Sequence, residues 1–403
     1  MVQSVLTSTS HGSERADMSA ASPRGFHCWT THLGLADEGR DDFSMVISDR
    51  PCTSSVVFTK SLFAGPCVTL SKTSIEQISP RGVLVLAKNA NVATGAEGLR
   101  NATEIRASVA RTVGIEPNAL IMASTGVIGV QYPMDTIRTG LDGLGQGTPL
   151  DAHAVARAIM TTDTRAKVSE RTVGTSTIVG IAKGVGMIEP DMATMLSFVF
   201  TDADVPQNTL DRIFRDVVDR TYNSVSIDTD TSTSDTAAIF ANGAAGPVPD
   251  TAFEQALEEV CTELVKMIAS DGEGATKLIV TTVSGASSER QARTVGKSII
   301  NSPLVKTMIH GEDPNWGRVL MAIGKCSSEV DIDPGKVRVA FADIDVYPNS
   351  SLDQQATIEA VRAHLATATV EINIDLGIGT DAWTVFGCDL TDGYIRINAD
   401  YTT

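Results

Sequence analysis

The sequence predicts a mixed α/β protein of more than one domain. Short apolar runs that fit buried strands, such as residues 83–87, lie between segments in which apolar residues recur at helical spacing. Nearer the carboxyl end, residues 337–341 alternate in the manner of a strand with one buried face. The chain has 403 residues, of which 42% are hydrophobic, and this is enough for a sizeable core.

A first zone is expected over residues 25–193. Its strand candidate at 83–87 precedes a predicted helix over 99–113, and a second helix is expected over 151–160. Asp151 is the expected N-cap of the second helix, because its side-chain oxygen can accept a backbone N–H of the first turn. The apolar face of the first helix consists of Leu99, Ile105, Val109 and Val113.

A second zone is expected over residues 194–284. It opens with a buried strand at 195–200 and continues with two amphipathic helices. Their apolar faces consist of Leu210, Ile213, Phe214, Val217 and Val218 in the first helix, and of Phe253, Leu257, Val260, Leu264 and Met267 in the second.

Residues 285–403 are expected to form a smaller α+β domain at the carboxyl end. The pattern predicts a helix over 291–300 and strands over 337–346, 370–376 and 394–398. At the other end, small and polar residues predict a disordered tail over 1–24 without the apolar segment of a signal peptide. Met18, inside this tail, is an alternative start.

The charge balance limits the classes of partner. The chain carries 32 Lys and Arg against 49 Asp and Glu, a formal net charge of −17, and has no dense basic run. We therefore expect no nucleic-acid or membrane partner, and no apolar run is long enough to span a bilayer. The six cysteines are widely spaced and form no CxxC pair, which is typical of reduced thiols in a cytoplasmic protein.

Several familiar cofactor motifs fail on inspection. Residues 228–239 resemble a calcium loop, but Thr233 stands where the turn glycine belongs and Ile239 where the bidentate glutamate belongs. A partial P-loop has Gln291 in place of its first glycine, and a partial dinucleotide motif has Glu189 in place of its third. No metal and no cofactor are predicted.

The polar cluster HGEDPNWGR at 310–318 is the most unusual in the chain. From the residues alone we interpret it as a structured turn in which Trp316 is buried and Arg318 pairs with Asp313.

The run KGVGMIEPDMATML at 183–196 contains a candidate nucleophile, Thr194, at the threshold of a predicted strand. A threonine hydroxyl needs a base beside it, and the α-amine of an amino-terminal threonine can be that base at neutral pH. Attack of the hydroxyl on the preceding carbonyl, followed by hydrolysis of the ester, would create such a terminus. Taken alone, however, a threonine at a strand start is more often structural.

The same run resembles the self-cleavage signature of the ornithine acetyltransferases, also called glutamate N-acetyltransferases. Further segments resemble this family in the family's order, from residue 25 to the carboxyl end, and the nearest resemblance is to the branch of the clavulanic-acid pathway. These segments are NANVATG at 89–95, ASTGVIG at 123–129, IMTTDT at 159–164, the Asp/Thr/Ser-rich run at 226–236, SDGEGA at 270–275, HGEDPNWGR at 310–318 and NADYTT at 398–403.

The resemblance implies a layered αββα sandwich of the N-terminal-nucleophile type, within the α/β (α+β) class. It implies a cut between Ala193 and Thr194, giving an α chain over 25–193 and a β chain from Thr194, assembled as α2β2. Thr194 would take the acetyl group of N2-acetylornithine, release ornithine, and pass the acetyl group to glutamate to form N-acetylglutamate. The expected context is amino-acid biosynthesis, either of arginine or of an antibiotic.

The resemblance also assigns the site. The hydroxyl of Thr125 and the backbone N–H of Gly126 would stabilise the oxyanion. The substrate contacts would be Thr161 (with Thr162 as the less favoured neighbour), Lys183, Thr194, Glu273, Asn398 and Thr403. A cation and an anion suit zwitterionic amino acids. In isolation, however, each of these residues is more often structural.

Two other hypotheses remain open. An amidohydrolase or aminopeptidase of the same fold would use water as the acceptor, whereas a derived binding protein would have lost the chemistry. The cleaved position in the related hydrolases is a serine, so Thr194 favours transfer. Val185 departs from the serine that many arginine-pathway members carry there.

Overall fold

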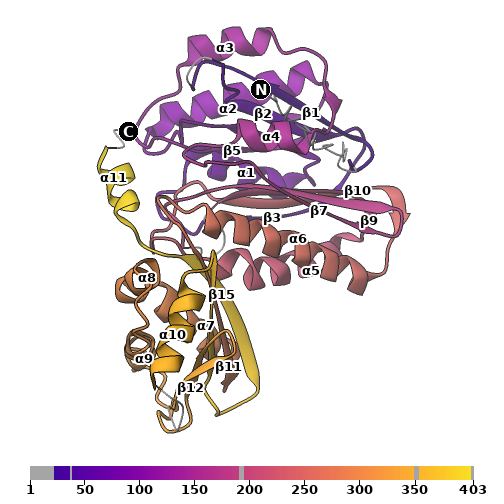
Figure 1. Ribbon diagram of the computed structural model, residues 1–403. Helices are drawn as coiled ribbons and strands as arrows, with labels where there is room; N and C mark the ends of the chain where they lie inside the picture. Colours follow the sequence, from indigo (N-terminus) through magenta and orange to yellow (C-terminus); the bar gives the residue numbers. More distant parts are fainter. Residues whose placement is uncertain (1–21, 37–38, 190–194, 349–353, 401–403) are drawn as a thin grey trace, which may run out of the picture.

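The chain consists of a four-layer sandwich and a smaller unit built on a third sheet. The computed structural model describes residues 22–36, 39–189, 195–348 and 354–400. Figure 1 shows the sandwich above the smaller unit, with helix α11 (Asp392–Asp400) beside their junction.

The first sheet has five strands in the order β5-β4-β2-β1-β6. Its central strands are antiparallel, and only β4 and β5 run parallel to each other. The strands are β1 (Phe26–Thr31), β2 (Phe43–Ser48), β4 (Gly82–Leu86), β5 (Leu120–Ser124) and β6 (Thr148–Pro149).

The second sheet also has five strands, in the order β3-β10-β9-β8-β7. The parallel pair β9 and β10 lies at its centre, so Thr236 is paired with Leu196 at the start of both strands. The strands are β3 (Thr53–Phe58), β7 (Lys167–Val173), β8 (Ser176–Lys183), β9 (Leu196–Asp204) and β10 (Thr236–Pro247).

The two sheets share an apolar interior. Phe200 is fully buried, with its ring centroid 5.4 Å from that of Phe26 on the first sheet and 5.7 Å from that of Phe240 on its own. Helix α4 (Ala152–Ala158) contacts both sheets, and Asp151 caps it as predicted, accepting the Ala154 N–H at 2.9 Å.

Helices cover both outer faces of the sandwich (Figure 1). Helices α2 (Gly95–Thr112) and α3 (Met134–Asp142) pack on the first sheet, and α1 (Pro66–Gln77) lies against its edge strand β5. Helices α5 (Gln207–Arg220) and α6 (Asp250–Ser270) pack on the second sheet. The expected αββα sandwich is therefore confirmed. Helices α2, α5 and α6 lie where the sequence predicts helices, whereas α1 and α3 were not predicted.

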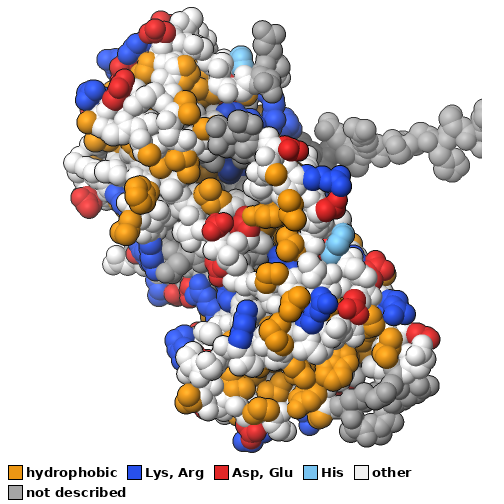
Figure 2. Space-filling model, turned by 90° about the vertical axis from the view of Figure 1, so that its left-hand side faces the viewer, with side chains coloured by type: hydrophobic (Ala, Val, Ile, Leu, Met, Phe, Trp, Pro, Cys, Tyr) orange, Lys and Arg blue, Asp and Glu red, His pale blue; other side chains and the backbone are white. Residues whose placement is uncertain are grey.

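The third sheet has its own apolar core and the order β13-β12-β14-β11-β15. Seven residues separate the end of α6 from the sheet's first strand, β11, and β15 contacts α6. Figure 2 shows a broad apolar patch on this unit. The elements are α7 (Glu289–Ile300), α8 (Pro303–His310), α9 (Gly317–Gly324), α10 (Gln354–Leu365), β11 (Leu278–Ala286), β12 (Arg338–Phe341), β13 (Ile344–Tyr347), β14 (Thr369–Asp375) and β15 (Asp381–Cys388).

The strand expected over 394–398 is wrong: these residues lie in the middle of helix α11. The side chain of Ile395 is 67% exposed, so the apolar alternation that suggested a strand does not mark a buried face. A helix satisfies its own backbone hydrogen bonds on the surface, whereas a strand needs a neighbouring strand. The single strand expected over 337–346 is instead a hairpin of β12 and β13.

Two polar segments are held by specific contacts. The end of the expected tail is tied to the sandwich, since the Ser22 hydroxyl donates to the Leu150 carbonyl and the Arg24 N–H to Asp202. Residues 1–21 lie outside the described part of the chain. In the 310–318 segment the predicted pair of Arg318 with Asp313 is present at 3.9 Å, whereas Trp316, predicted to be buried, is only partly buried against the core of the third sheet.

No helix among the described residues is both long and apolar enough to cross a membrane. All six cysteines are free, and five of them are buried.

Replacing the central aromatic ring tests the sandwich interior. Phe200→Ala should lower the free energy of unfolding by about 3–5 kcal/mol, because it removes a large buried side chain and leaves a cavity. Urea unfolding followed by fluorescence measures this. Phe63, which is 74% exposed, gives the matched control: Phe63→Ala should stay within about 0.5 kcal/mol. Equal effects of the two changes would contradict this account of the interior.

Candidate active site

An open cavity of about 370 Å³ lies where strands β5, β8 and β9 meet the loop before β10, the turn after α6 and helix α11. Its lining consists of Ala90, Thr125, Gly126, Ile128, Thr161, Thr162, Lys183, Gly184, Gly186, Met187, Met195, Leu196, Ser232, Thr233, Ser234, Asp235, Glu273 and Asn398.

Lys183, the last residue of β8, is the buried cation of this cavity. Its Nζ atom donates to the hydroxyl of Thr125 at 2.8 Å and to that of Thr161 at 3.1 Å. The antiparallel register places Lys183 opposite Leu196, the first residue of β9. Burial lowers the pKa of the ammonium, although the carboxylates of Asp163 and Asp235 act in the opposite direction.

The Thr125–Gly126 turn follows β5 and has a backbone that only glycine fits. Gly126 has φ +133°, and a Cβ atom there would lie 2.1 Å from the Lys88 carbonyl carbon. Because the Thr125 hydroxyl oxygen already accepts from Lys183, its own proton is free for another acceptor. The turn thus presents a polarised hydroxyl and a backbone amide to the cavity.

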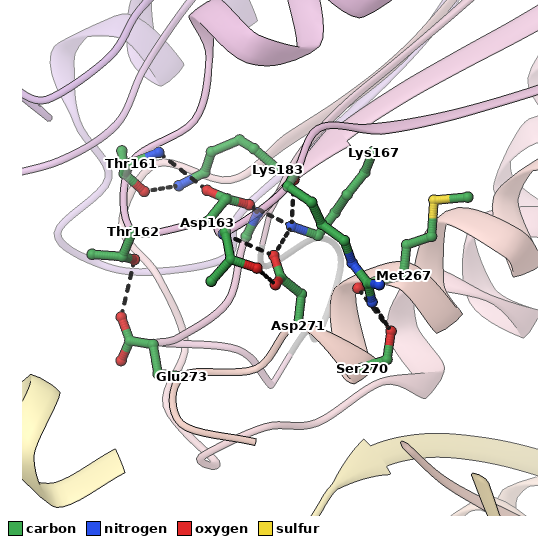
Figure 3. Close-up of polar contacts among 12 residues, drawn as sticks. Thr161, Thr162, Asp163, Lys167, Lys183, Met267, Ser270, Asp271 and Glu273 are labelled. Atoms are coloured by element: carbon green, nitrogen blue, oxygen red, sulfur yellow. Dashed lines mark hydrogen bonds and ion pairs between the residues drawn. The ribbon is translucent and has the colours of Figure 1, made fainter. Parts of the chain in front are cut away.

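A buried ion network lies behind Lys183 (Figure 3). The Lys167 ammonium is fully buried and lies 2.7 Å from Asp163 and 2.6 Å from Asp271. Asp163 also accepts the backbone N–H groups of Thr161 and Gly184. Burial would raise the pKa of Asp163, but the charges of Lys183 and Lys167 outweigh it and lower that pKa to about 2.

Glu273 lies on the opposite side of the cavity, in the turn after α6. Its Oε1 accepts the Thr162 hydroxyl at 3.0 Å, and its Oε2 accepts the Asn398 amide of α11 at 2.9 Å. A Cβ atom at Gly186 would come within 2.6 Å of the Glu273 carboxylate, so the glycine makes room for this side chain. Glu273 is half-buried and open to the cavity.

Asp235 also lines the cavity, although the sequence did not predict it as a site residue. Its side chain is 3% exposed, and among the described residues its Oδ2 has no hydrogen-bond partner. Burial raises the pKa of Asp235 well above its ordinary value, against the effects of Ser232 and Lys183. The only sequence signal was its place in the Asp/Thr/Ser-rich run, which was considered as a calcium loop and rejected; no potential metal cluster occurs among the described residues.

The structure brings together six of the predicted site residues, namely Thr125, Gly126, Thr161, Lys183, Glu273 and Asn398. Thr162, the less favoured neighbour, also lines the cavity. The remaining predicted residues, Ala193, Thr194 and Thr403, lie outside the described residues. Met195, which follows Thr194 in the sequence, lines the cavity wall.

The cavity can therefore offer hydrogen-bond donors to an anionic oxygen, together with charges of both signs for a small zwitterion. It can also offer a protonatable carboxyl. These are the requirements of acyl transfer between polar small molecules.

Comparison with known proteins agrees with this chemistry. The model of the ArgJ family matches residues 27–403. The arginine biosynthesis bifunctional protein ArgJ of Rhodococcoides fascians is 92% identical over 403 residues, covering all of both chains. Glutamate N-acetyltransferase Oat2 of Streptomyces clavuligerus is 55% identical over 396 residues, covering 96% of this chain and 100% of that protein.

Among solved structures, the arginine biosynthesis bifunctional protein ArgJ of Bacillus halodurans is 39% identical. It aligns with a TM-score of 0.48 over 52% of this chain and 100% of that one.

The chain is an enzyme of the acyltransferase class. It belongs to the ArgJ family, which confirms the resemblance found in the sequence.

The charge network predicts a pH-dependent stability. Asp163→Asn should lower the free energy of unfolding by about 3 kcal/mol at pH 7, because Lys167 and Lys183 lose a buried counter-charge. The lowered pKa of Asp163 means that its contribution is complete above its unfolded pKa and is lost as pH falls toward about 2. The difference in the free energy of unfolding between wild type and variant should therefore decrease by about 1 kcal/mol from pH 7 to pH 3.

Urea unfolding at the two pH values measures this gap. Asp41→Asn, at an exposed position, is the control and should show no comparable gap. A gap that widened at pH 3 would contradict the assignment of the network.

Proposed function

We propose that this enzyme transfers the acetyl group of N2-acetylornithine to glutamate by a ping-pong reaction through an acetyl ester of Thr194. The observation that carries the proposal is the convergence of Lys183, Glu273 and the Thr125–Gly126 turn on one cavity, which the residue after Thr194 also lines. Oppositely charged groups suit amino-acid substrates, and the turn suits a tetrahedral intermediate.

The nucleophile would be created by self-cleavage between Ala193 and Thr194. The products would be an α chain over 25–193 and a β chain that opens with the second half of the sandwich, 194–284, and ends in the unit at 285–403. The freed α-amine of Thr194 would take the hydroxyl proton during attack and return it to the departing group. Two cleaved precursors would assemble as α2β2 in the cytoplasm.

The oxyanion of each tetrahedral intermediate would be held by the Thr125 hydroxyl and the Gly126 backbone N–H. The contact of the Lys183 ammonium with Thr125 supports this role, because a donated hydrogen bond from a cation makes the hydroxyl a stronger donor.

Glu273 would bind the ammonium group of the amino acid, and Asn398 would orient the Glu273 carboxylate. The remaining donor of Lys183, together with Thr161, would serve a substrate carboxylate. Thr403 would complete the site from the carboxyl end. No metal or cofactor enters the proposed reaction.

Arginine biosynthesis is the proposed context. The relative at 92% identity is named for that pathway, whereas the Streptomyces clavuligerus protein at 55% identity is named for glutamate N-acetylation.

Self-cleavage and the acetyl ester can be tested on the same preparation. Purified wild-type protein should separate into two bands on a denaturing gel, and Thr194→Ala should remain a single band. N2-acetylornithine should then add one acetyl group to the chain that begins at Thr194, measured by intact-protein mass. A single wild-type band would refute the proposal. Release of acetate at the same rate with and without glutamate would favour a hydrolase.

Removing the charge of Glu273 tests the ammonium site. Glu273→Gln should raise KM for N2-acetylornithine by about 10- to 100-fold with a smaller change in kcat, because a charged hydrogen bond to the substrate contributes about 1.5–3 kcal/mol. Glu116→Gln, at an exposed loop position, is the matched control and should leave both constants unchanged. An unchanged KM for Glu273→Gln would remove Glu273 from the binding site.

A further inference from the structure

One buried acid of the cavity has no role in the reaction proposed above. Asp235 stands just before β10, and Thr236 next to it donates its backbone N–H to the Met195 carbonyl at 3.0 Å. The carboxyl therefore belongs to the cavity wall at the point where β9 begins, two residues after Thr194 in the sequence.

The surroundings of Asp235 leave one of its side-chain oxygens buried without a hydrogen-bond partner. The residue is 3% exposed, and within the described part of the chain its Oδ2 accepts no hydrogen bond. A buried carboxyl oxygen without a partner is costly, and a ligand that supplies the missing donor recovers that cost. The charged groups facing the cavity beside it are Lys183 on β8 and Glu273 after α6.

Amines supply such a donor, and the reaction creates a need for it. At neutral pH glutamate arrives with a protonated amine, which cannot attack an ester until it loses a proton. The nitrogen of N2-acetylornithine must gain two protons to leave as the ammonium ion of ornithine, and the Thr194 hydroxyl supplies only one of them through the α-amine. Lys183 and Glu273 are not assigned this proton, because the proposed reaction uses them to bind the charged groups of the substrates.

We propose that Asp235 is a catalytic acid and base that carries a proton between the two amino-acid nitrogens. This rests on the proposed function. As the acetyl–nitrogen bond of N2-acetylornithine breaks and the ester forms, the Thr194 hydroxyl proton passes through the α-amine to the leaving nitrogen. The Asp235 carboxylic acid gives that nitrogen a second proton, so ornithine departs as an ammonium ion. Asp235 then remains deprotonated while the acetyl group is on Thr194.

In the second half the Asp235 carboxylate takes one proton from the glutamate ammonium. The free amine attacks the ester, the new carbon–nitrogen bond forms, and the carbon–oxygen bond to the nucleophile breaks. The second amine proton returns to the nucleophile's oxygen through the α-amine. One proton has then moved from the acceptor to the donor nitrogen, and Asp235 is again protonated, so the cycle closes without another reactant.

The test uses substrates that need this proton and substrates that do not. An aryl acetate such as p-nitrophenyl acetate acetylates without protonation of its leaving group, and hydroxylamine accepts acetyl as a neutral nucleophile at pH 7. The experiment measures, by intact-protein mass and single-turnover rates, acetylation by the aryl acetate and by N2-acetylornithine. It then measures deacetylation by hydroxylamine and by glutamate.

Asp235→Asn keeps the shape of the side chain but cannot carry the proton. The variant should still cleave itself, and its single-turnover rates with p-nitrophenyl acetate and hydroxylamine should stay within a few-fold of wild type. Its rates with N2-acetylornithine and glutamate should fall by about 10²- to 10⁴-fold. Asp230→Asn, at an exposed position in the same run, is the matched control and should behave as wild type with all four compounds.

Equal losses with all four compounds would overturn the proposal, because they would indicate a structural defect. Wild-type rates for Asp235→Asn with all four would overturn it as well. An uncut variant would also overturn it, since the carboxyl would then be required before any amine binds. Failure of wild-type enzyme to gain acetyl from N2-acetylornithine would instead refute the proposed function itself.

Discussion

The site depends on one buried cation, the Lys167 ammonium, held between Asp163 and Asp271. Asp163 belongs to the turn before β7. Asp271 directly follows α6, 104 residues further along the chain than Lys167. A fully buried ammonium that loses its counter-charges is strongly unfavourable, so this contact fixes the two segments to each other. Each segment then presents its neighbours to the cavity: Thr161 and Thr162 on one side, Glu273 on the other.

The electrostatics of the cavity differ from those of the whole chain. The net charge is −17, yet the cavity balances Lys183 against Glu273 and holds a third group, Asp235, whose raised pKa lets it keep a proton. Such a set of groups suits ligands that carry both charges and exchange a proton on reaction. Burial is the common cause of both pKa shifts, since it lowers the pKa of Lys183 and raises the pKa of Asp235.

Helical periodicity predicted five of the eleven α-helices that the structure describes, because an apolar stripe must face a core whatever that core is. The helices that cover the second sheet, α5 and α6, and the N-cap of α4 follow that expectation. Periodicity failed over 394–398, because the absence of a neighbouring strand cannot be read from local alternation. It also gave no signal for Asp235, whose importance rests on burial and on an unpaired oxygen, neither of which is a property of sequence.

The sequence by itself determined the class of fold and the family, and it predicted six residues that line the candidate site, since these follow from hydrophobic patterning and from motifs that keep their order. Only the tertiary structure decided which of them meet. The contacts of Lys183 with Thr125 and of Glu273 with Asn398 join residues 58 and 125 positions apart. Such distant pairs are set by strand register, by the close approach that Gly126 and Gly186 allow, and by the buried charges that no local pattern encodes.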